Sequence, residues 1–297
     1  MVHPGRALPD ARDAWMGRPV RPTRPRAVMG VTMANPREEP PAFSELDESL
    51  RAALRFLAYE CTDPGPVPEG PALLPRSETL HLEAAPLDSA TAAMAHGLQE
   101  CLESESTTPR LTVVLDLDET LSHCRLEPLE SLRPDFCVQF EESKATGYVY
   151  VRPHARLFLE AAARLFEVVV FTASSKSYAD QVLDQLDPGH QCISTRLYRP
   201  HCVERSGAFL KDLRRMGRRM DRCLLVDNSP VSLALCPDNA IVCSSWTAED
   251  PLDEELLELL LLLQTCDLEV SVPKFLGRRY GLRALVELLR RRPDLLE

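Results

Sequence analysis

The segment VVLDLDETL, Val113 to Leu121, joins a buried-strand pattern directly to two carboxylates. Its aliphatic run begins at Leu111, and Asp116 and Asp118 follow where that run ends. In open parallel sheets, ligands bind beyond the carboxyl ends of the strands. We therefore expect Asp116 and Asp118 to lie where reacting groups are found in this class of fold.

Outward from this segment, strand-like apolar runs alternate with helical patterns. The next two runs are EVVVFT, Glu167 to Thr172, and RCLLVD, Arg222 to Asp227. Helices are expected at 154–165, 176–186, 209–216 and, rich in Leu, at 253–264. This alternation predicts an α/β domain with a central parallel sheet flanked by helices. The stretch FCVQFEESKATGYVYV, 136–151, alternates around a Gly-containing turn and predicts an inserted β-hairpin.

Two carboxylates at one strand end can divide the steps of phosphoryl transfer. One can attack phosphorus and form an aspartyl-phosphate, while the other protonates the leaving oxygen and later takes a proton from water. Adjacent negative charges resist joint ionisation and repel a phosphate dianion, so this chemistry needs a divalent cation. Mg²⁺ suits the site because it prefers oxygen ligands and keeps several waters. A calcium loop needs Gly at the sixth position, where this chain has Leu121.

Three further polar positions follow apolar segments in the same part of the chain. Thr172 ends the second strand in FTASS, Lys211 lies in FLKDL, and Asp227 and Asn228 end the third strand in VDNSP. Each pattern alone is also typical of something simpler: a helix cap, a solvated basic face or a turn. Their order after the acidic pair is what favours a phosphate site.

Taken in this order, the motifs resemble the haloacid-dehalogenase superfamily and, within it, the FCP1/SCP-type protein phosphatases. The tail VPKFLGRRYGLRALVELL is similar to that of the CTD small phosphatase-like 2 branch. The matching segments are DLDET (116–120), YVRPHARLFLE (150–160), FTASSKSYAD (171–180), LDPGH (186–190), RLYRPHC (196–202), LKDL (210–213), VDNSP (226–230) and PDNAIVCSSW (237–246). The resemblance implies a haloacid-dehalogenase-like, Rossmann-type sheet and a phosphoserine or phosphothreonine substrate.

The resemblance also implies a role for each candidate residue. Asp116 would be the nucleophile, and Asp118 the general acid and base with its backbone carbonyl on the metal. The residues implied in phosphate binding are Thr120, Thr172, Lys211 and Arg199, and Thr172 and Lys211 are also implied in catalysis. Those implied in the Mg²⁺ shell are Asp116, Asp118, Asn228 and Asp227.

The chain departs from the family pattern at positions that affect substrate choice. Leu126 stands where the small CTD phosphatases have an aromatic residue that lines a substrate-proline pocket. Ala208 and Phe209 stand where the family favours an Asn and an aromatic residue, and no aromatic follows Trp246. We therefore expect activity to be kept, while an RNA polymerase II tail is not assured as the substrate.

Residues 1–108 differ in composition from the remainder of the chain. Fourteen of the 25 prolines lie there, which predicts a largely disordered, low-complexity region. Helical patterns at 44–60 and 90–102 interrupt it and offer contact surfaces for a protein partner. The phosphatase domain is expected over 109–291.

Charge and composition exclude several classes of protein. The net charge of −11 argues against direct binding of nucleic acid through an overall positive field. The longest aliphatic stretch, Leu259 to Leu263, is too short to span a bilayer. Ten cysteines without a CxxC pair or a signal-peptide core favour reduced thiols inside the cell, in the nucleus or the cytoplasm.

The sequence therefore predicts a Mg²⁺-dependent protein serine/threonine phosphatase that acts on a phosphoprotein. Two alternatives stay open at this point. One is a small-molecule phosphatase of the same superfamily, although the space between Thr120 and Phe171 hardly accommodates a large cap. The other is a noncatalytic relative that binds phosphoproteins, although such relatives usually lose the acidic pair that Asp116 and Asp118 form here.

Overall fold

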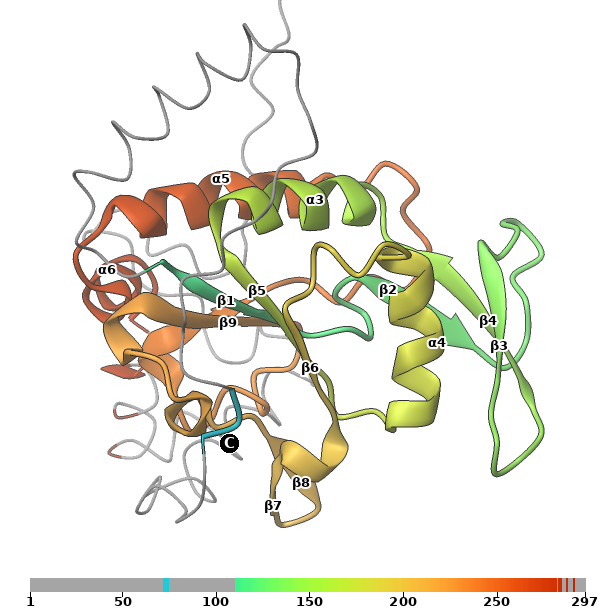
Figure 1. The fold of residues 1–297 in the computed structure, drawn as a ribbon, viewed down its shortest axis with the longest axis horizontal. Coiled ribbons are helices and arrows are strands. Elements are labelled where there is room, and N and C mark those ends of the chain that lie inside the picture. The colour runs from blue at the N-terminus through green and yellow to red at the C-terminus, as the bar shows by residue number, and fades with distance from the viewer. Residues whose placement is uncertain (1–71, 75–109, 282, 285–286, 288–290, 292–297) are drawn as a thin grey trace, which may run out of the picture.

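The computed structural model describes residues 72–74 and 110–281, together with positions 283, 284, 287 and 291. Its centre is a five-stranded sheet of order β10-β9-β1-β5-β6, in which every neighbouring pair is parallel (Figure 1). The strands are β1 (Thr112–Leu115), β5 (Glu167–Phe171), β6 (Thr195–Leu197), β9 (Cys223–Asp227) and β10 (Ala240–Val242). The predicted parallel sheet is confirmed, with its three apolar strands side by side at the centre.

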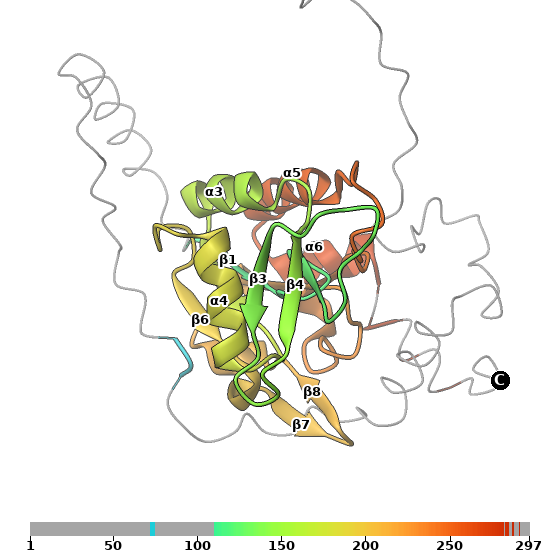
Figure 2. The ribbon, with the colours of Figure 1, turned by 90° about the vertical axis from the view of Figure 1, so that its right-hand side faces the viewer.

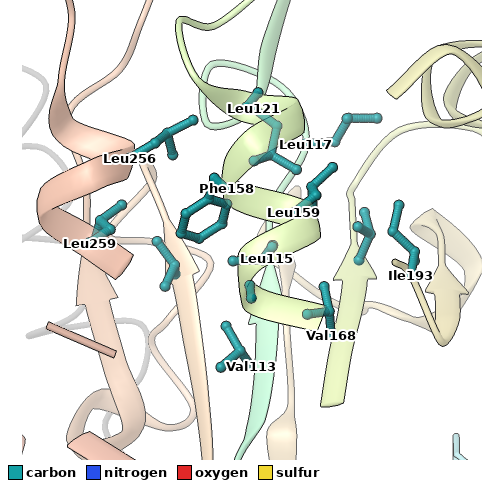
Figure 3. Close-up of a cluster of buried hydrophobic side chains, with 14 of the residues drawn as sticks. Val113, Leu115, Leu117, Leu121, Phe158, Leu159, Val168, Ile193, Leu256 and Leu259 are labelled. Carbon is teal, nitrogen blue, oxygen red and sulfur yellow. The ribbon is translucent and has the colours of Figure 1, made fainter. Parts of the chain in front are cut away.

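Helices cover one face of this sheet. They are α3 (Ala155–Leu165), α4 (Lys176–Leu186), α5 (Glu255–Leu268) and α6 (Val272–Arg279), and α3 packs beside α5. Val113, Leu115 and Val168 project from the strands into the layer formed by Phe158 and Leu259 (Figure 3). Burying one such side chain stabilises the fold by about 1.5–3 kcal/mol. None of the helices in the described part of the chain is long and apolar enough to cross a membrane.

The opposite face is covered by short turns and a hairpin. Val114, Val169 and Leu225 belong to a second buried cluster that includes Leu213 and Met216 of the 3₁₀ turn η4 (Leu213–Met216). Because successive strand residues alternate between faces, Val113 and Val114 enter different clusters. A sheet covered on both faces explains why β1 is an unbroken aliphatic run. The hairpin is β7 (Val203–Arg205) with β8 (Ala208–Leu210), and the other 3₁₀ turns are η3 (Arg199–His201), η5 (Met220–Arg222) and η6 (Pro237–Asn239).

An antiparallel sheet of order β2-β4-β3 is inserted after β1, and Figure 2 shows its strands β3 and β4 side by side. Its strands are β2 (Ser122–Arg125), β3 (Phe136–Gln139) and β4 (Thr146–Val151). The predicted hairpin is therefore confirmed, but its glycine is not in the turn. Gly147 lies within β4, where an added Cβ would come within 2.7 Å of the Cys124 Sγ and 2.9 Å of Phe140 and Val138 side-chain atoms. Close packing, and not turn geometry, requires Gly at this position.

The helix predicted over 209–216 is wrong. Phe209 and Leu210 belong to β8, and only the single turn η4 follows. The Asp212 carboxylate accepts a hydrogen bond from the Arg214 N–H at the start of that turn, and Gly217 ends it with a φ of 69°. Strand pairing and these two stop signals override the helical pattern. The helices predicted at 44–60 and 90–102 lie outside the described residues.

Candidate active site

The predicted residues meet at the carboxyl edge of three neighbouring strands. β1 lies between β5 and β9, and the chain passes from β1 to β5 before it returns on the other side to β9. In sheets of this class, ligands bind beyond the strand ends at the point where the direction of the connections reverses. Asp116 directly follows β1, Thr172 directly follows β5, and Asp227 is the last residue of β9. The topology thus collects side chains that are distant in sequence.

The chain turns sharply after Asp116. The Asp116 N–H donates to the Val226 carbonyl at 2.9 Å, so this residue continues the pairing of β1 with β9. The Leu121 N–H then donates to the Leu117 carbonyl at 2.9 Å, which closes one turn. Glu119 adopts a left-handed φ of 58° within it, a conformation that costs a non-Gly residue about 1 kcal/mol or more. The strained turn keeps both predicted aspartates within one short loop.

Lys211 joins two of the predicted carboxylates. Val114 and Leu225, which lie two residues before Asp116 and Asp227, belong to the second buried cluster. Side chains two residues apart in a strand point to the same face, so both aspartates point toward the face that Lys211 covers. The Lys211 Nζ donates to the Asp116 Oδ1 at 2.5 Å and to the Asp227 Oδ2 at 2.6 Å. With 1% exposure, Lys211 is buried between them.

This triad holds one positive and two negative groups out of water. Burial alone would lower the pKa of Lys211, but Asp116 and Asp227 raise it overall, so the amine stays charged. Burial raises the pKa of Asp227 to about 6, with Lys211 opposing the shift and Asp116 adding to it. The Asp227 Oδ1 also accepts the Ser229 N–H at 2.7 Å. Both Asp227 oxygens are therefore engaged, and in this arrangement the residue holds Lys211 in place.

Asp118 faces a different set of partners. Its Oδ1 accepts the Tyr178 hydroxyl at 2.6 Å, and its Oδ2 accepts the Ser174 hydroxyl at 2.7 Å and the Thr172 hydroxyl at 3.4 Å. Burial raises the pKa of Asp118 to about 6, and the neighbouring Asp116 adds to this shift. A carboxyl group that gains and loses a proton near neutral pH is suited to general acid and base catalysis.

Oxygen atoms of Asp116 and Asn228 converge beside Thr120. The Thr120 Oγ1 lies 3.4 Å from the Asp116 Oδ2 and 3.4 Å from the Asn228 Oδ1. These contacts are long for a hydroxyl hydrogen bond, so both acceptor oxygens keep capacity for a cation. The Asn228 Nδ2 donates to the Ser245 hydroxyl at 2.9 Å, which turns the amide oxygen toward Thr120.

This donor set fits Mg²⁺. No group of three or more His, Cys, Asp or Glu side chains suited to a metal occurs in the residues that the structure describes. The oxygens that lie together beside Thr120 are those of the Asp116 carboxylate and the Asn228 amide, and the roles of the Asp118 carbonyl and of Asp227 as ligands stay predictions. Mg²⁺ accepts few protein oxygens because it keeps several waters, whereas Zn²⁺ favours nitrogen and sulfur ligands.

Thr172 and Arg199 lie along one rim of the site. The Thr172 Oγ1 accepts the Ser174 N–H at 3.0 Å, which shapes the loop after β5. Arg199 is exposed; its Nε donates to the Ala173 carbonyl at 2.6 Å, and its guanidinium lies 5.1 Å from the centre of the Phe209 ring. Within the described residues, no hydrogen bond joins Arg199 to the aspartates or to Lys211. Its predicted contact with phosphate stays a prediction.

A fully buried arginine supports the loop from behind. The Arg152 guanidinium donates to the backbone carbonyl of Thr120 at 3.3 Å and to that of Ser244 at 3.2 Å. It also forms ion pairs with Asp253 at 2.8 Å and Glu255 at 2.7 Å, at the start of α5. Burial opposes the charge, but these carboxylates raise the pKa of Arg152 overall. The catalytic loop is thus tied to a helix much later in the chain.

Sequence reasoning missed three residues that shape the site: Ser174, Tyr178 and Arg152. All three lie inside segments that were singled out, FTASSKSYAD and YVRPHARLFLE. A signal for Tyr178 was available, because α4 begins at Lys176 and helix side chains lean toward the helix N-terminus, here toward the β5 edge. Arg152 gave no such signal, since its partners are about 100 residues away.

Comparisons with known proteins show which family and which relatives this chain is similar to. The sequence profile of the NLI interacting factor-like phosphatase family matches residues 111–273. The CTD small phosphatase-like protein 3 of Caenorhabditis elegans is 43% identical over 178 residues, which is 60% of this chain and 62% of that protein. The CTD small phosphatase-like protein 2 of Dictyostelium discoideum is 42% identical over 161 residues, 54% of this chain and 28% of that protein. The chain spans less than two thirds of either relative.

A solved structure of the fission yeast RNA polymerase II CTD phosphatase Fcp1, bound to beryllium fluoride, can also be superposed on the chain. The superposition covers 66% of this chain and 65% of that one, with 19% identity and a TM-score of 0.40.

Proposed function

The chain belongs to the NLI interacting factor-like phosphatase family, and from that premise we propose that it is a Mg²⁺-dependent protein serine/threonine phosphatase working through an aspartyl-phosphate. The observation that carries the proposal is the division of surroundings between two neighbouring carboxylates. Asp116 faces Lys211 and the oxygens around Thr120, while Asp118 faces Tyr178 and Ser174. When two carboxylates have surroundings this different, one is suited to act as a nucleophile and the other as a general acid and base.

In the first step, a carboxylate oxygen of Asp116 forms a bond to phosphorus. The bond from phosphorus to the serine or threonine oxygen breaks, and the leaving oxygen takes the proton of Asp118. Lys211 holds one Asp116 oxygen and sets the orientation of the other. Thr172, beside Asp118, supplies a hydroxyl for the phosphoryl oxygens.

In the second step, water attacks the aspartyl-phosphate. Asp118, now ionised, takes a proton from that water, and the bond between phosphorus and the Asp116 oxygen breaks. Its raised pKa of about 6 suits both roles near neutral pH. Mg²⁺, held by Asp116, Asn228 and the Asp118 carbonyl, would neutralise phosphate charge next to the nucleophile.

The positive charge in the site explains why a buried carboxylate pair is tolerated. Lys211 compensates Asp116 and Asp227 before substrate arrives. A carboxylate left buried without its partner would cost several kcal/mol. We infer that the charge of Lys211 offsets the charge of Asp116 and holds this carboxylate in position for attack on phosphorus.

For the substrate, we propose a phosphoprotein. The insertion after β1 is a small antiparallel sheet and not a large cap, which leaves room for a protein chain at the site. Leu126 is 66% exposed, so an apolar surface is retained where an aromatic residue is missing. We expect a preference different from that of enzymes specific for the RNA polymerase II tail. An intracellular location and a protein partner for residues 1–108 remain part of the proposal, and neither nucleic acid nor a membrane is invoked.

The proposal is tested with p-nitrophenyl phosphate and with phosphoserine peptides, in Mg²⁺ and in a chelator. We expect the native chain to hydrolyse these substrates in Mg²⁺ but not in the chelator. We expect no hydrolysis by Asp116→Asn in either. Asp184→Asn makes the same change at an exposed aspartate of α4 and should leave the rate unchanged. Full activity of Asp116→Asn would refute the mechanism.

The same preparation separates the alternatives. Hydrolysis of small phosphate esters but not of any phosphopeptide would favour a small-molecule phosphatase. Binding of phosphopeptides without turnover would favour a noncatalytic relative. Asp118→Asn should retain substrate on the enzyme and allow the phosphoprotein to be identified.

A further inference from the structure

Three residues from the N-terminal segment lie on the phosphatase domain. They are Ala72, Leu73 and Leu74, and the next residue that the structure describes is Arg110. Leu74 is 3% exposed and belongs to the second buried cluster, and Leu73 packs against the same cluster. The Leu73 N–H donates to the Arg215 carbonyl at 2.8 Å. Apolar burial and a backbone hydrogen bond together hold this tripeptide on the η4 turn.

Gly217 is shaped for this contact. Its φ of 69° is a conformation that L side chains rarely adopt, so Gly is favoured there even without a neighbour. In addition, a Cβ on Gly217 would lie 2.6 Å from the Ala72 Cβ. The next nearest atoms, the Leu74 carbonyl oxygen at 3.7 Å and the Ala72 Cα at 4.0 Å, are at ordinary contact distance. Ala72 alone therefore makes this approach too close for any residue but Gly.

A proline flanks the tripeptide on each side. The stretch reads PALLP, with Pro71 before Ala72 and Pro75 after Leu74. Proline restricts its own φ and biases the preceding residue toward extended conformations. A segment restricted in this way loses less conformational entropy when it binds. Two adjacent leucines then supply the apolar contact.

The docking surface shares a short stretch of chain with the catalytic site. Lys211 is followed directly by Asp212, whose carboxylate caps η4 by accepting the Arg214 N–H at 3.0 Å. η4 ends at Gly217. Leu210, directly before Lys211, is in the same buried cluster as Leu74. The residues before and after Lys211 are therefore packed by the cluster that Leu74 completes.

We propose that Ala72–Leu74 is an intramolecular docking motif for the η4 turn, and that its docking holds the segment carrying Lys211 in its catalytic position. The occupant of this surface is the chain's own N-terminal segment. Lys211 acts on the reacting groups, whereas Leu74 is a positioning residue that acts through η4.

Hydrogen–deuterium exchange of the full-length chain tests the docking. Because the Leu73 N–H is hydrogen-bonded to Arg215, its exchange should be at least about tenfold slower than that of an unprotected amide. Leu74→Asp should remove this protection and speed exchange across 213–217. Leu252→Asp, the same change at a leucine that is 83% exposed, serves as the matched control and should alter neither. Equally fast exchange of Leu73 in the native chain and in Leu74→Asp would overturn the docking.

A pair of substitutions isolates the contact from folding. Gly217→Ala should weaken docking, since the new methyl group meets the Ala72 Cβ. Ala72→Gly added to Gly217→Ala removes that Cβ and should restore slow exchange of Leu73, although the φ strain at position 217 remains. Loss of protection in the double variant equal to that in Gly217→Ala alone would show that strain, and not docking, is responsible.

The link to Lys211 has its own measurement. A synthetic peptide of residues 67–80, added to full-length Leu74→Asp, should slow exchange at 211–217 again, while a scrambled peptide should not. With p-nitrophenyl phosphate, Leu74→Asp should lower kcat several-fold with little change in KM, and the peptide should reverse this loss. Unchanged exchange at 211–217 in Leu74→Asp would overturn the positioning role. The exchange measurements do not depend on turnover, so they test the docking even if the proposed phosphatase activity is wrong.

Discussion

The two ends of the central sheet hold similar side chains in opposite electrostatic conditions. At the amino end, Glu167 at the start of β5 accepts two hydrogen bonds from Arg218, at 2.6 and 2.8 Å, and one from the Thr112 hydroxyl at 2.7 Å. Burial would raise the pKa of Glu167, but Arg218 and Thr112 lower it overall. At the carboxyl end, burial raises the pKa values of Asp118 and Asp227 to about 6.

This difference separates residues that stabilise the fold from residues that serve chemistry. A carboxylate whose pKa falls on folding stabilises the native state at neutral pH, and one whose pKa rises destabilises it. The amino end of the sheet thus carries a stabilising pair, Glu167 with Arg218, and the carboxyl end carries destabilising carboxyl groups, Asp118 and Asp227. Such destabilisation is expected where activity, and not stability, has determined the residues.

The largest expected effect comes from removing the central charge at the carboxyl end. Lys211→Met leaves Asp116 and Asp227 buried without their cation, which should lower the free energy of unfolding by about 3–5 kcal/mol. Turnover should also be lost. Urea denaturation followed by circular dichroism measures the first effect. Lys176→Met, which removes a largely exposed lysine of α4, should change stability by less than about 0.5 kcal/mol.

The opposite change is expected at Asp118. Asp118→Asn removes a charge that burial disfavours, so the free energy of unfolding at pH 8 should rise, by at most about 3 kcal/mol. The amide can still accept the Tyr178 hydroxyl. Thermal denaturation in a chelator shows the effect, and turnover should be abolished in the same variant. A lower melting temperature would contradict the assignment of destabilisation to this edge.

A smaller loss is expected at the amino end. Glu167→Gln weakens the paired hydrogen bonds from Arg218 and should lower the free energy of unfolding by about 1–2 kcal/mol. Because this edge is remote from the candidate active site, kcat and KM for p-nitrophenyl phosphate should be unchanged. A large loss of turnover without a loss of stability would show that the two edges are not independent.

The pH dependence of these variants sharpens the comparison further. The folded pKa of Asp118, about 6, lies above its unfolded value near 3.8, so its destabilising effect is absent below that value and grows as pH rises through 6. The folded pKa of Glu167 lies below its unfolded value, so its stabilising effect is lost as pH falls through the folded pKa. Above pH 6, Asp118→Asn should therefore melt at a higher temperature than the native chain, and Glu167→Gln at a lower one. Both differences should shrink in acid.

Much of the fold and the centre of the site follow from local pattern. β1 is buried on both faces, and a strand of that kind can be recognised in the sequence as an aliphatic run with polar residues at its end. Asp116, Asp118 and Asn228 could be predicted because strand ends in a parallel sheet share one edge. Lys211 is a candidate by its order among the motifs, but its pattern is equally typical of a solvated basic face, because its position depends on which face of the sheet β8 covers.

The errors and omissions have a common physical cause. Ser174 and Arg152 act through partners that only tertiary structure brings near, so no local pattern marks them, whereas the place of Tyr178 at the start of α4 was a usable signal. The sequence at 209–216 has a helical pattern, but β8 pairs with β7 and the Asp212 cap starts only a short 3₁₀ turn, so no α-helix forms there. Gly147 looked like a turn residue because its sequence neighbours do not reveal the Cys124, Val138 and Phe140 side chains that crowd it.

Arg152 also makes the loop after β1 depend on residues that are synthesised much later. The ribosome makes Arg152 101 residues before its partner Asp253, and the Thr120 carbonyl that it supports comes earlier still. Until the first turn of α5 has left the exit tunnel, the guanidinium lacks its counter-charges and the catalytic loop lacks its anchor. A nascent chain that already carries Asp116 and Asp118 therefore lacks this support for their loop until Asp253 and Glu255 have been added.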